Sequence, residues 1–132
     1  MIRTASLEQA ELAIIGAGCA GLSLARQLVR TEKTSSIKAC LYGPVSPATT
    51  NRHSWGFWAT QGLKEQTELA RQRWHKWQII TAERKVTQTA DSHPYCRLDS
   101  RDWLTHCLNI IDGNIPQEPD KLPTPGAKPV FD

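Results

Sequence analysis

The sequence lacks the features that identify several classes of protein. Its longest uncharged run, from Leu12 to Ala25, contains three glycines, whereas a membrane-spanning helix needs about 20 predominantly apolar residues. The four cysteines form no Cys-x-x-Cys pair, and no histidine lies at zinc-ligand spacing, so we expect reduced thiols and no metal site. Glu8 and Glu11 stand where a signal peptide would carry positive charge. We therefore expect a cytoplasmic protein.

Neither positively nor negatively charged residues are in large excess. Sixteen Lys and Arg residues against thirteen Asp and Glu residues leave a net charge of +3, which is too small and too mixed for a nucleic-acid-binding surface. A length of 132 residues is about that of one domain, and a hydrophobic content of 39% with five Trp residues supports a modest core. The sequence thus predicts a small folded protein with no nucleic-acid partner.

A strand, a glycine turn and a helix follow one another near the start of the chain. Residues 11–15 form a short apolar run, typical of strands that are buried on both faces in a parallel sheet. The turn Gly-Ala-Gly-Cys-Ala-Gly follows at 16–21, and residues 22–30 place apolar side chains on one helical face. A G-x-G-x-x-G turn in this context predicts a site for the diphosphate of a dinucleotide.

Each glycine has a separate role in such a site. Gly16 lets the chain turn sharply off the strand, Gly18 lets the backbone approach a diphosphate, and Gly21 lets the helix lie close to the sheet. The N–H groups of the first helical turn then face the phosphates. No Gly-Lys-Ser/Thr follows, which excludes a Walker loop. The alternative is a turn that only packs the helix on the strand. The predicted cofactor contacts are Gly16, Ala17, Gly18, Cys19, Ala20 and Gly21.

A second strand is predicted at 37–42, so residues 11–42 form a β-α-β unit. At the end of this strand the dinucleotide fingerprint expects an Asp or Glu that binds the ribose hydroxyls. Tyr42 and Gly43 occupy this place instead. We expect the ribose to be held by the Tyr42 hydroxyl or by backbone amides near Gly43, or to be bound weakly.

The segment 51–58, Asn-Arg-His-Ser-Trp-Gly-Phe-Trp, is predicted to lie in a loop that begins with Pro44 and Pro47 and covers a cofactor. Together with the glycine turn, this segment resembles the lycopene cyclase family, flavoproteins that close the ends of linear carotenoids into rings. Two later segments, 74–77 (Trp-His-Lys-Trp) and 94–104 (Pro-Tyr-Cys-Arg-Leu-Asp-Ser-Arg-Asp-Trp-Leu), are similar to the N-terminal region of that family. The resemblance runs from about residue 11 to about residue 108.

The resemblance implies a cofactor and a reaction. Family members bind FAD, require its reduction by NADPH or NADH, and catalyse a cyclisation with no net redox change. The substrate, a linear carotenoid such as lycopene, is protonated at one end, the carbocation closes a six-membered ring, and a proton is lost. A water-excluding apolar site with a fixed negative charge suits such a cation. The apolar substrate implies that a complete family member makes peripheral contact with a membrane.

The resemblance assigns no catalytic residue to this sequence. The acidic groups that serve as acid and base in the family lie downstream of the region represented here, and Glu65, Glu68 and Asp99 lie in no matching motif. The four histidines form neither a triad nor a metal-site pattern. Contacts to substrate or flavin are expected from four residues of the predicted loop: His53, Trp55, Phe57 and Trp58.

The remaining sequence predicts a mixed α+β segment. Segments 77–82 and 85–89 are predicted as a pair of strands joined near residues 83 and 84. Before them, a helix is predicted from four apolar residues at helical spacing: Leu63, Ala70, Trp74 and Trp77. A last helix, N-capped by Ser100 and with Asp102 in its first turn, is predicted to bury Trp103, Leu104, Cys107 and Leu108.

Prolines crowd the end of the chain, where five of the eight fall within fourteen residues: Pro116, Pro119, Pro123, Pro125 and Pro129. This density predicts a disordered tail where a dinucleotide-binding sheet would supply its third parallel strand. The fold class is therefore α/β, with an incomplete Rossmann-like FAD-binding β-α-β unit followed by the mixed α+β segment. The expected division is an N-terminal extension (1–10), a partial FAD-binding domain with an inserted substrate-side segment (11–111) and the Pro-rich tail (112–132).

The leading hypothesis is the N-terminal, FAD-binding fragment of a lycopene cyclase that forms ionone-type end rings with reduced FAD. Such a fragment is expected to be inactive by itself, because the catalytic part is missing from it. Two alternatives remain open at this point: a fragment of another flavoprotein oxidoreductase, of the polyprenyl reductase or hydroxylase type, and a remnant without function.

Overall fold

The computed structural model describes residues 10–44 and 52–120. The chain divides into two compact units, the first formed by Met1–Asn51 with Leu104–Asp132 and the second by Arg52–Trp103. The predicted division at residues 10 and 111 stays a prediction, and the predicted N-terminal extension, the position of Pro47 and the tail beyond residue 120 lie outside the described residues.

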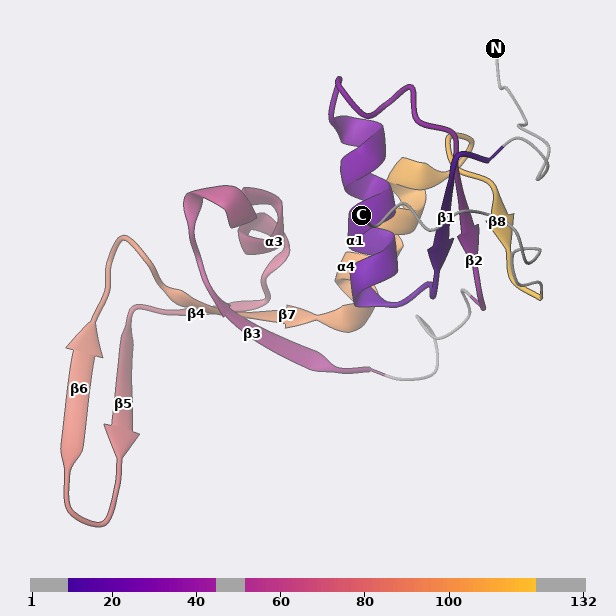
Figure 1. The fold of residues 1–132 in the computed structure, drawn as a ribbon. Helices are drawn as coiled ribbons and strands as arrows, with labels where there is room; N and C mark the ends of the chain where they lie inside the picture. The colour runs from indigo at the N-terminus through magenta and orange to yellow at the C-terminus, as the bar shows by residue number, and fades with distance from the viewer. Residues whose placement is uncertain (1–9, 45–51, 121–132) are drawn as a thin grey trace. The chain divides into compact units, whose positions relative to one another are not determined.

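The first unit contains a parallel sheet of three strands in the order β1-β2-β8 (Figure 1). The strands are β1 (Leu12–Ile15), β2 (Ala39–Tyr42) and β8 (Gln117–Glu118). All four residues of β2 are buried, as the sequence pattern of a central parallel strand indicates. The β-α-β unit predicted for residues 11–42 is confirmed, and its parallel sheet is that of a Rossmann-like fold.

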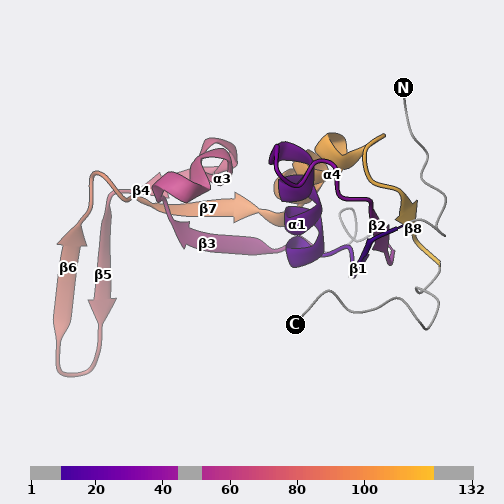
Figure 2. The ribbon, with the colours of Figure 1, turned by 45° about the horizontal axis from the view of Figure 1, so that its top comes forward.

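Two helices cover one face of this sheet. Helix α1 (Cys19–Arg30) connects β1 to β2 and buries Leu22, Ala25 and Leu28. Helix α4 (Ser100–Ile111) crosses from the second unit into the first, and its first-unit part lies beside α1 (Figures 1 and 2). That part buries Leu104, Cys107 and Ile111. The predicted face is therefore correct except for Leu108, which is only half-buried, whereas Ile111 is fully buried.

Strand β8 corrects the prediction that no third strand follows the last helix. Pro116 precedes this strand, and its carbonyl oxygen accepts a hydrogen bond from the Leu41 N–H at 2.9 Å. The missing N–H of a proline does no harm here, because only the carbonyl is needed and β8 lies at the edge of the sheet. The first part of the segment predicted to be disordered thus adds a third strand to the sheet.

The second unit contains an antiparallel sheet in the order β3-β7-β4. Its strands are β3 (Ser54–Trp58), β7 (Tyr95–Asp99) and β4 (Gln72–Trp74). The loop predicted over residues 51–58 is wrong for residues 54–58, because these form β3 and pair with the whole of β7. The aromatic residues of this segment favour a strand, and Gly56 leaves room for the ring of Tyr95, which lies where a Cβ of residue 56 would stand.

The helix predicted through Trp77 is shorter than expected. A 3-10 turn, η2 (Gln61–Leu63), leads into α3 (Lys64–Leu69), and the chain then extends into β4. Trp74 and Trp77 lie on strands instead, where they take part in an aromatic cluster with Trp58 and Tyr95. The predicted strand pair is confirmed as the hairpin β5 (Lys76–Ile80) and β6 (Lys85–Thr89), labelled in Figure 2.

Helix α4 begins one residue earlier than the predicted N-cap implies. Ser100 is its first residue, and the side chain of Asp99 accepts a hydrogen bond from the Arg101 N–H at 3.0 Å. Asp99 therefore caps the helix. The Ser100 hydroxyl is used elsewhere, since its oxygen accepts a hydrogen bond from the His53 N–H at 2.9 Å. The predicted place of Asp102 in the first turn is confirmed.

Candidate functional site

The glycine turn joins β1 to α1 at the carboxyl end of the parallel strands. Gly16 has a φ of +104°, in the left-handed region that other residues rarely adopt. Its N–H donates to the carbonyl oxygen of Tyr42 at 2.8 Å. The turn is therefore fixed to the end of β2, and the chain reverses off the sheet as the motif requires.

Gly21 is required by packing. A Cβ at this position would overlap the carbonyl oxygen of Gly16 and would lie 3.4 Å from the Cγ2 atom of Ile14. Only a residue without a side chain lets the first turn of α1 rest on the turn that precedes it. This is the close helix-to-sheet approach predicted for the last glycine of the motif.

Gly18 is required neither by backbone conformation nor by packing. Its φ of −89° and ψ of −161° are open to any residue, and a Cβ built on it would meet nothing within 4 Å. A glycine with no structural need for its missing side chain is what a backbone designed to approach a ligand would show. The residues present therefore fit a dinucleotide diphosphate.

The start of α1 offers hydrogen-bond donors and no negative charge. Gly18 is the N-cap, with no side-chain hydrogen bond to the helix, and the first turn carries no acidic residue. The first N–H groups of a helix have no acceptor within the helix itself, and the helix dipole adds partial positive charge there. Cys19, Ala20 and Gly21 therefore present their N–H groups as donors suited to an anion.

Tyr42 and Gly43 lie next to this turn. A Cβ on Gly43, whose φ is +118°, would lie 3.5 Å from the Cα atom of Gly16 and 3.6 Å from the nitrogen of Ala17. The Tyr42 side chain is buried, and burial together with the neighbouring Cys40 thiol raises the pKa of its hydroxyl. A ribose contact by Tyr42 stays a prediction.

Three of the residues predicted to contact substrate or flavin, Trp55, Phe57 and Trp58, lie on β3 in the second unit, and His53 directly precedes this strand. Trp58 is 51% exposed, whereas Trp55 and Phe57 are half-buried on the opposite face of the strand, and His53 is exposed. The ring of Trp58 packs edge-on against Tyr95 at 4.9 Å and against Trp77 at 6.2 Å. Their contact with a ligand stays a prediction.

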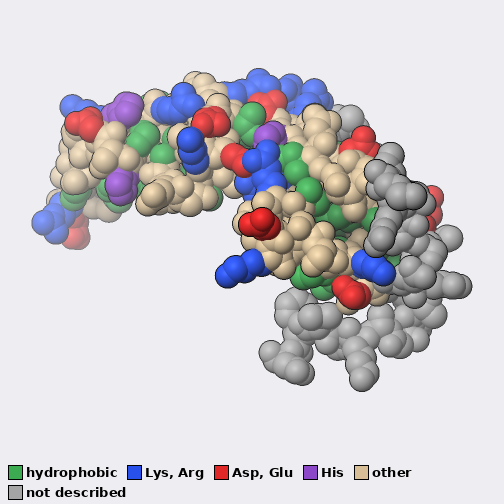
Figure 3. Space-filling model, turned by 90° about the horizontal axis from the view of Figure 1, so that it is seen from above, with side chains coloured by type: hydrophobic (Ala, Val, Ile, Leu, Met, Phe, Trp, Pro, Cys, Tyr) green, Lys and Arg blue, Asp and Glu red, His purple; other side chains and the backbone are tan. Residues whose placement is uncertain are grey.

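Hydrophobic side chains of the second unit reach the surface around this cluster. Among the residues that the structure describes, the large exposed ones in this unit are Trp58, Trp74, Ile79, Ile80 and Val86. Figure 3 shows hydrophobic side chains at the surface beside Lys and Arg side chains. The indole N–H of Trp77 is buried without an acceptor among the described residues. The aromatic cluster is therefore partly open to solvent, unlike a hydrophobic core.

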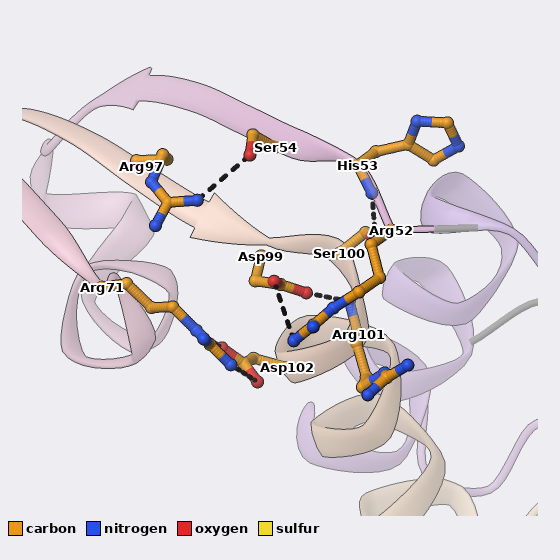
Figure 4. Close-up of polar contacts among 9 residues, drawn as sticks. All are labelled: Arg52, His53, Ser54, Arg71, Arg97, Asp99, Ser100, Arg101 and Asp102. Carbon is orange, nitrogen blue, oxygen red and sulfur yellow. Dashed lines mark hydrogen bonds and ion pairs between the residues drawn. The ribbon is translucent and has the colours of Figure 1, made fainter. Parts of the chain in front are cut away.

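Acidic groups near β3 are held by arginines, an arrangement that the sequence analysis did not predict (Figure 4). Asp102 accepts two hydrogen bonds from Arg71, at 2.7 and 3.1 Å, and Arg52 lies 3.5 Å from Asp99. Arg71 holds the pKa of Asp102 below its ordinary value. The partners are 31 residues apart for Arg71 and Asp102, so no local pattern indicates the pair.

Comparison with known families decides what kind of protein carries this site. A family model described as "Lycopene cyclase protein" matches residues 11–110, which include the glycine turn, both β1 and β2, and the aromatic strand. The chain belongs to the lycopene cyclase family. A search of curated proteins gives no match. The resemblance found in the sequence is thereby confirmed, and it covers almost the same residues.

The described part of this lycopene cyclase family member contains neither a metal-site cluster nor a helix that could span a membrane. Within residues 10–44 and 52–120, no group of three or more His, Cys, Asp or Glu side chains could hold a metal ion. No helix within the same ranges is long and apolar enough to cross a membrane.

The cysteine at the glycine turn provides a chemical probe of this site. Cys19 is exposed, whereas Cys40, Cys96 and Cys107 are buried, and burial raises the pKa of the thiols of Cys40 and Cys96. A thiol reagent at neutral pH is therefore expected to modify Cys19 first. FAD at tenfold its Kd is expected to slow this modification about tenfold, because only the free protein reacts.

Mass spectrometry of peptides labelled with iodoacetamide measures this protection. FMN, which lacks the adenosine and its diphosphate link, is the control and should leave the rate unchanged. Equal labelling of Cys19 with and without FAD would contradict a dinucleotide site at the turn.

The Arg71–Asp102 pair gives a prediction about pH. A lowered pKa means that the ionised carboxylate adds stability above its unfolded pKa, and that this contribution is lost as the pH falls through the folded pKa. Because the pair is partly exposed, we expect Asp102→Asn to lower Tm by less than about 4 °C at neutral pH. The difference should shrink as the pH falls below about 4, the ordinary pKa of an Asp side chain.

Thermal unfolding followed by circular dichroism between pH 3 and pH 7 tests this expectation. Asp91→Asn, at an exposed bend of the same unit, is the matched control. A difference between Asp102→Asn and the wild-type protein that stays constant over this range would show that the ion pair is not its cause.

Proposed function

We propose that the chain binds FAD at the turn Gly16–Gly21. The N–H groups at the start of α1 hold the diphosphate, and the backbone at Gly18 makes the closest approach to it. The single observation that carries the proposal is the place of Gly18, which needs no glycine for its own conformation or packing and is the N-cap of α1 within the glycine turn. The family match over residues 11–110 supports the choice of a flavin dinucleotide.

The function proposed for this site is a part in the cyclisation of linear carotenoids, with lycopene as the substrate. Ionone-type end rings would form by protonation and ring closure without net oxidation. Reduced FAD, with NADPH or NADH as the reductant, would supply stabilisation of positive charge or a proton-transfer partner. The chain's own contribution is to hold the cofactor, and the aromatic residues of β3 are proposed to contact the substrate or the flavin.

No described carboxylate near β3 is proposed as the acid that protonates the substrate. Asp99 is 7% exposed, caps α4 and is paired with Arg52. Asp102 is paired with Arg71, which lowers its pKa and keeps it ionised at neutral pH. A general acid needs a pKa near the working pH. We therefore propose that this chain alone does not cyclise carotenoids.

Cytoplasmic localisation with peripheral contact to a membrane is proposed on the same basis. A linear carotenoid is dissolved in lipid, so a protein that acts on it must reach the lipid surface. The exposed apolar residues of β5 and β6 are compatible with this contact. Sedimentation with lipid vesicles measures it, and a chain that stays in the supernatant with carotenoid-loaded vesicles would contradict it.

Binding of FAD is tested first. The purified full chain is incubated with FAD and passed through a desalting column. We expect retained flavin absorbance, quenched flavin fluorescence and a higher Tm, since a ligand that binds only the folded state stabilises it. A folded chain that retains no flavin and gains no thermal protection would refute the proposal.

The proposed reaction is tested separately. Expression of this chain in a lycopene-accumulating host is expected to give no ring-ended carotenoid. Ring-ended products would refute the proposed inactivity and would require an acid among the residues present. FAD binding with oxidised or reduced polyprenyl products instead would favour a reductase or a hydroxylase.

A further inference from the structure

The chain lacks a carboxylate at the end of β2, where the dinucleotide fingerprint places one on the ribose. The structure places a carboxylate one strand away. Glu118 ends β8, which pairs in parallel with β2, and it lies in register with Tyr42. Neighbouring strands are about 4.8 Å apart, so Glu118 stands at the same edge of the sheet as the missing residue.

Main-chain contacts connect Glu118 to the glycine turn. The Gly16 N–H donates to the Tyr42 carbonyl oxygen at 2.8 Å, and the Gly43 N–H donates to the Glu118 carbonyl oxygen at 3.0 Å. Gly43 in turn packs against Gly16 and Ala17. Main-chain hydrogen bonds therefore fix the end of β8 beside the end of β2, and the end of β2 beside the turn.

The Glu118 side chain lies on the same face of the sheet as that of Tyr42, because residues in register on parallel strands point the same way. Glu118 is half-buried. Burial and the neighbouring Cys40 raise the pKa of the Tyr42 hydroxyl, and the charge of Glu118 adds to this effect, which agrees with a carboxylate near the end of β2. The pairing of β8 with β2 therefore brings a carboxylate to the edge of the sheet where the fingerprint expects one.

We propose that Glu118 accepts a hydrogen bond from the 2′-hydroxyl of the ribose in the adenosine half of the bound dinucleotide. This role rests on the proposed binding of FAD at the glycine turn. An ionised carboxylate only accepts hydrogen bonds and so suits a hydroxyl donor. The same charge repels a 2′-phosphate, so the site takes an adenosine diphosphate with a free ribose and rejects its 2′-phosphorylated form.

Competition against FAD fluorescence tests the proposal with the full chain. The probes are ADP, 2′-deoxyADP and adenosine 2′,5′-bisphosphate. The variant is Glu118→Ala, and the matched control is Glu32→Ala, an exposed residue in the connection between α1 and β2. We expect Glu118→Ala to weaken FAD binding about tenfold, whereas Glu32→Ala changes it less than twofold; charge-assisted hydrogen bonds have about this strength.

The ligand series adds a readout that a purely structural role would not move. The wild-type protein should prefer ADP over 2′-deoxyADP, and Glu118→Ala should lose that preference and bind the 2′-phosphate better. A variant that binds FAD and discriminates like wild type would overturn the role of Glu118 and leave FAD binding intact. A folded wild-type chain that binds neither FAD nor ADP would overturn both.

Loss of fold is monitored by circular dichroism. If Glu118→Ala does not fold, Glu118→Gln and the wild-type ligand series decide the question. Equal affinity of the wild-type protein for ADP and 2′-deoxyADP then refutes the proposal without any variant.

Discussion

Replacing Gly18 with serine is expected to weaken FAD binding by about 10- to 100-fold while leaving Tm unchanged or slightly higher. The new side chain has open space within the protein, so the fold should accept it. Serine is also a good N-cap, and its hydroxyl would bond to the N–H groups at the start of α1. The substitution thus blocks the approach of the diphosphate and competes for its donors.

Gly62→Ser is the matched control, because a Cβ at Gly62 also meets nothing within 4 Å and Gly62 lies in η2 of the second unit. Fluorescence titration gives the Kd for FAD, and thermal unfolding gives Tm. Unchanged FAD affinity in Gly18→Ser would contradict the proposed approach of the backbone to the diphosphate. An equal loss of affinity in Gly62→Ser would show that the effect is not local.

Gly21→Ala is expected to destabilise the protein by roughly 3 kcal/mol. The direction of this change in stability is informative, because alanine in a helix is normally about 1 kcal/mol more favourable than glycine. At this position the added Cβ would overlap the carbonyl oxygen of Gly16, so α1 must move away from the turn. FAD binding should fall as well, because the N–H donors move with the helix.

Urea unfolding monitored by circular dichroism gives the free energy of unfolding of Gly21→Ala and of wild type. Gly62→Ala is the control, because a Cβ at this position meets nothing within 4 Å and the free energy of unfolding should change little. A more stable Gly21→Ala protein would show that the helix does not need the close contact with Gly16.

The sequence predicted the first part of the fold well because its signals are local. An apolar run, a glycine turn and an amphipathic helix follow one another within residues 11–30, and the structure has them in that order. The roles of Gly16 and Gly21 could be predicted for the same reason, since the motif sets both spacing and backbone geometry.

The errors concern features that depend on distant partners. Residues 54–58 became a strand because β7, some forty residues later, pairs with them. Trp74 satisfies a helical spacing, but it lies on a strand and packs on Tyr95. Strand β8 was not predicted because prolines disfavour strands, whereas β2 needs only the carbonyl oxygen of Pro116 as an acceptor.

The candidate site shows the same division. The donors at 19–21 were predictable from the motif, whereas Glu118 lies 75 positions beyond Gly43 and reaches it only through the pairing of β8 with β2. The arginine partners of Asp99 and Asp102 likewise come from segments that only the antiparallel sheet brings near α4.

The strand order has a consequence for how the chain acquires its structure. All of the second unit separates β2 from β8, so a ribosome must synthesise the whole of it before β8 emerges. Long sequence separation slows folding, and an unpaired strand edge invites association with other chains. The nascent protein therefore carries an open edge on β2 throughout that interval, when chaperone binding would be most useful.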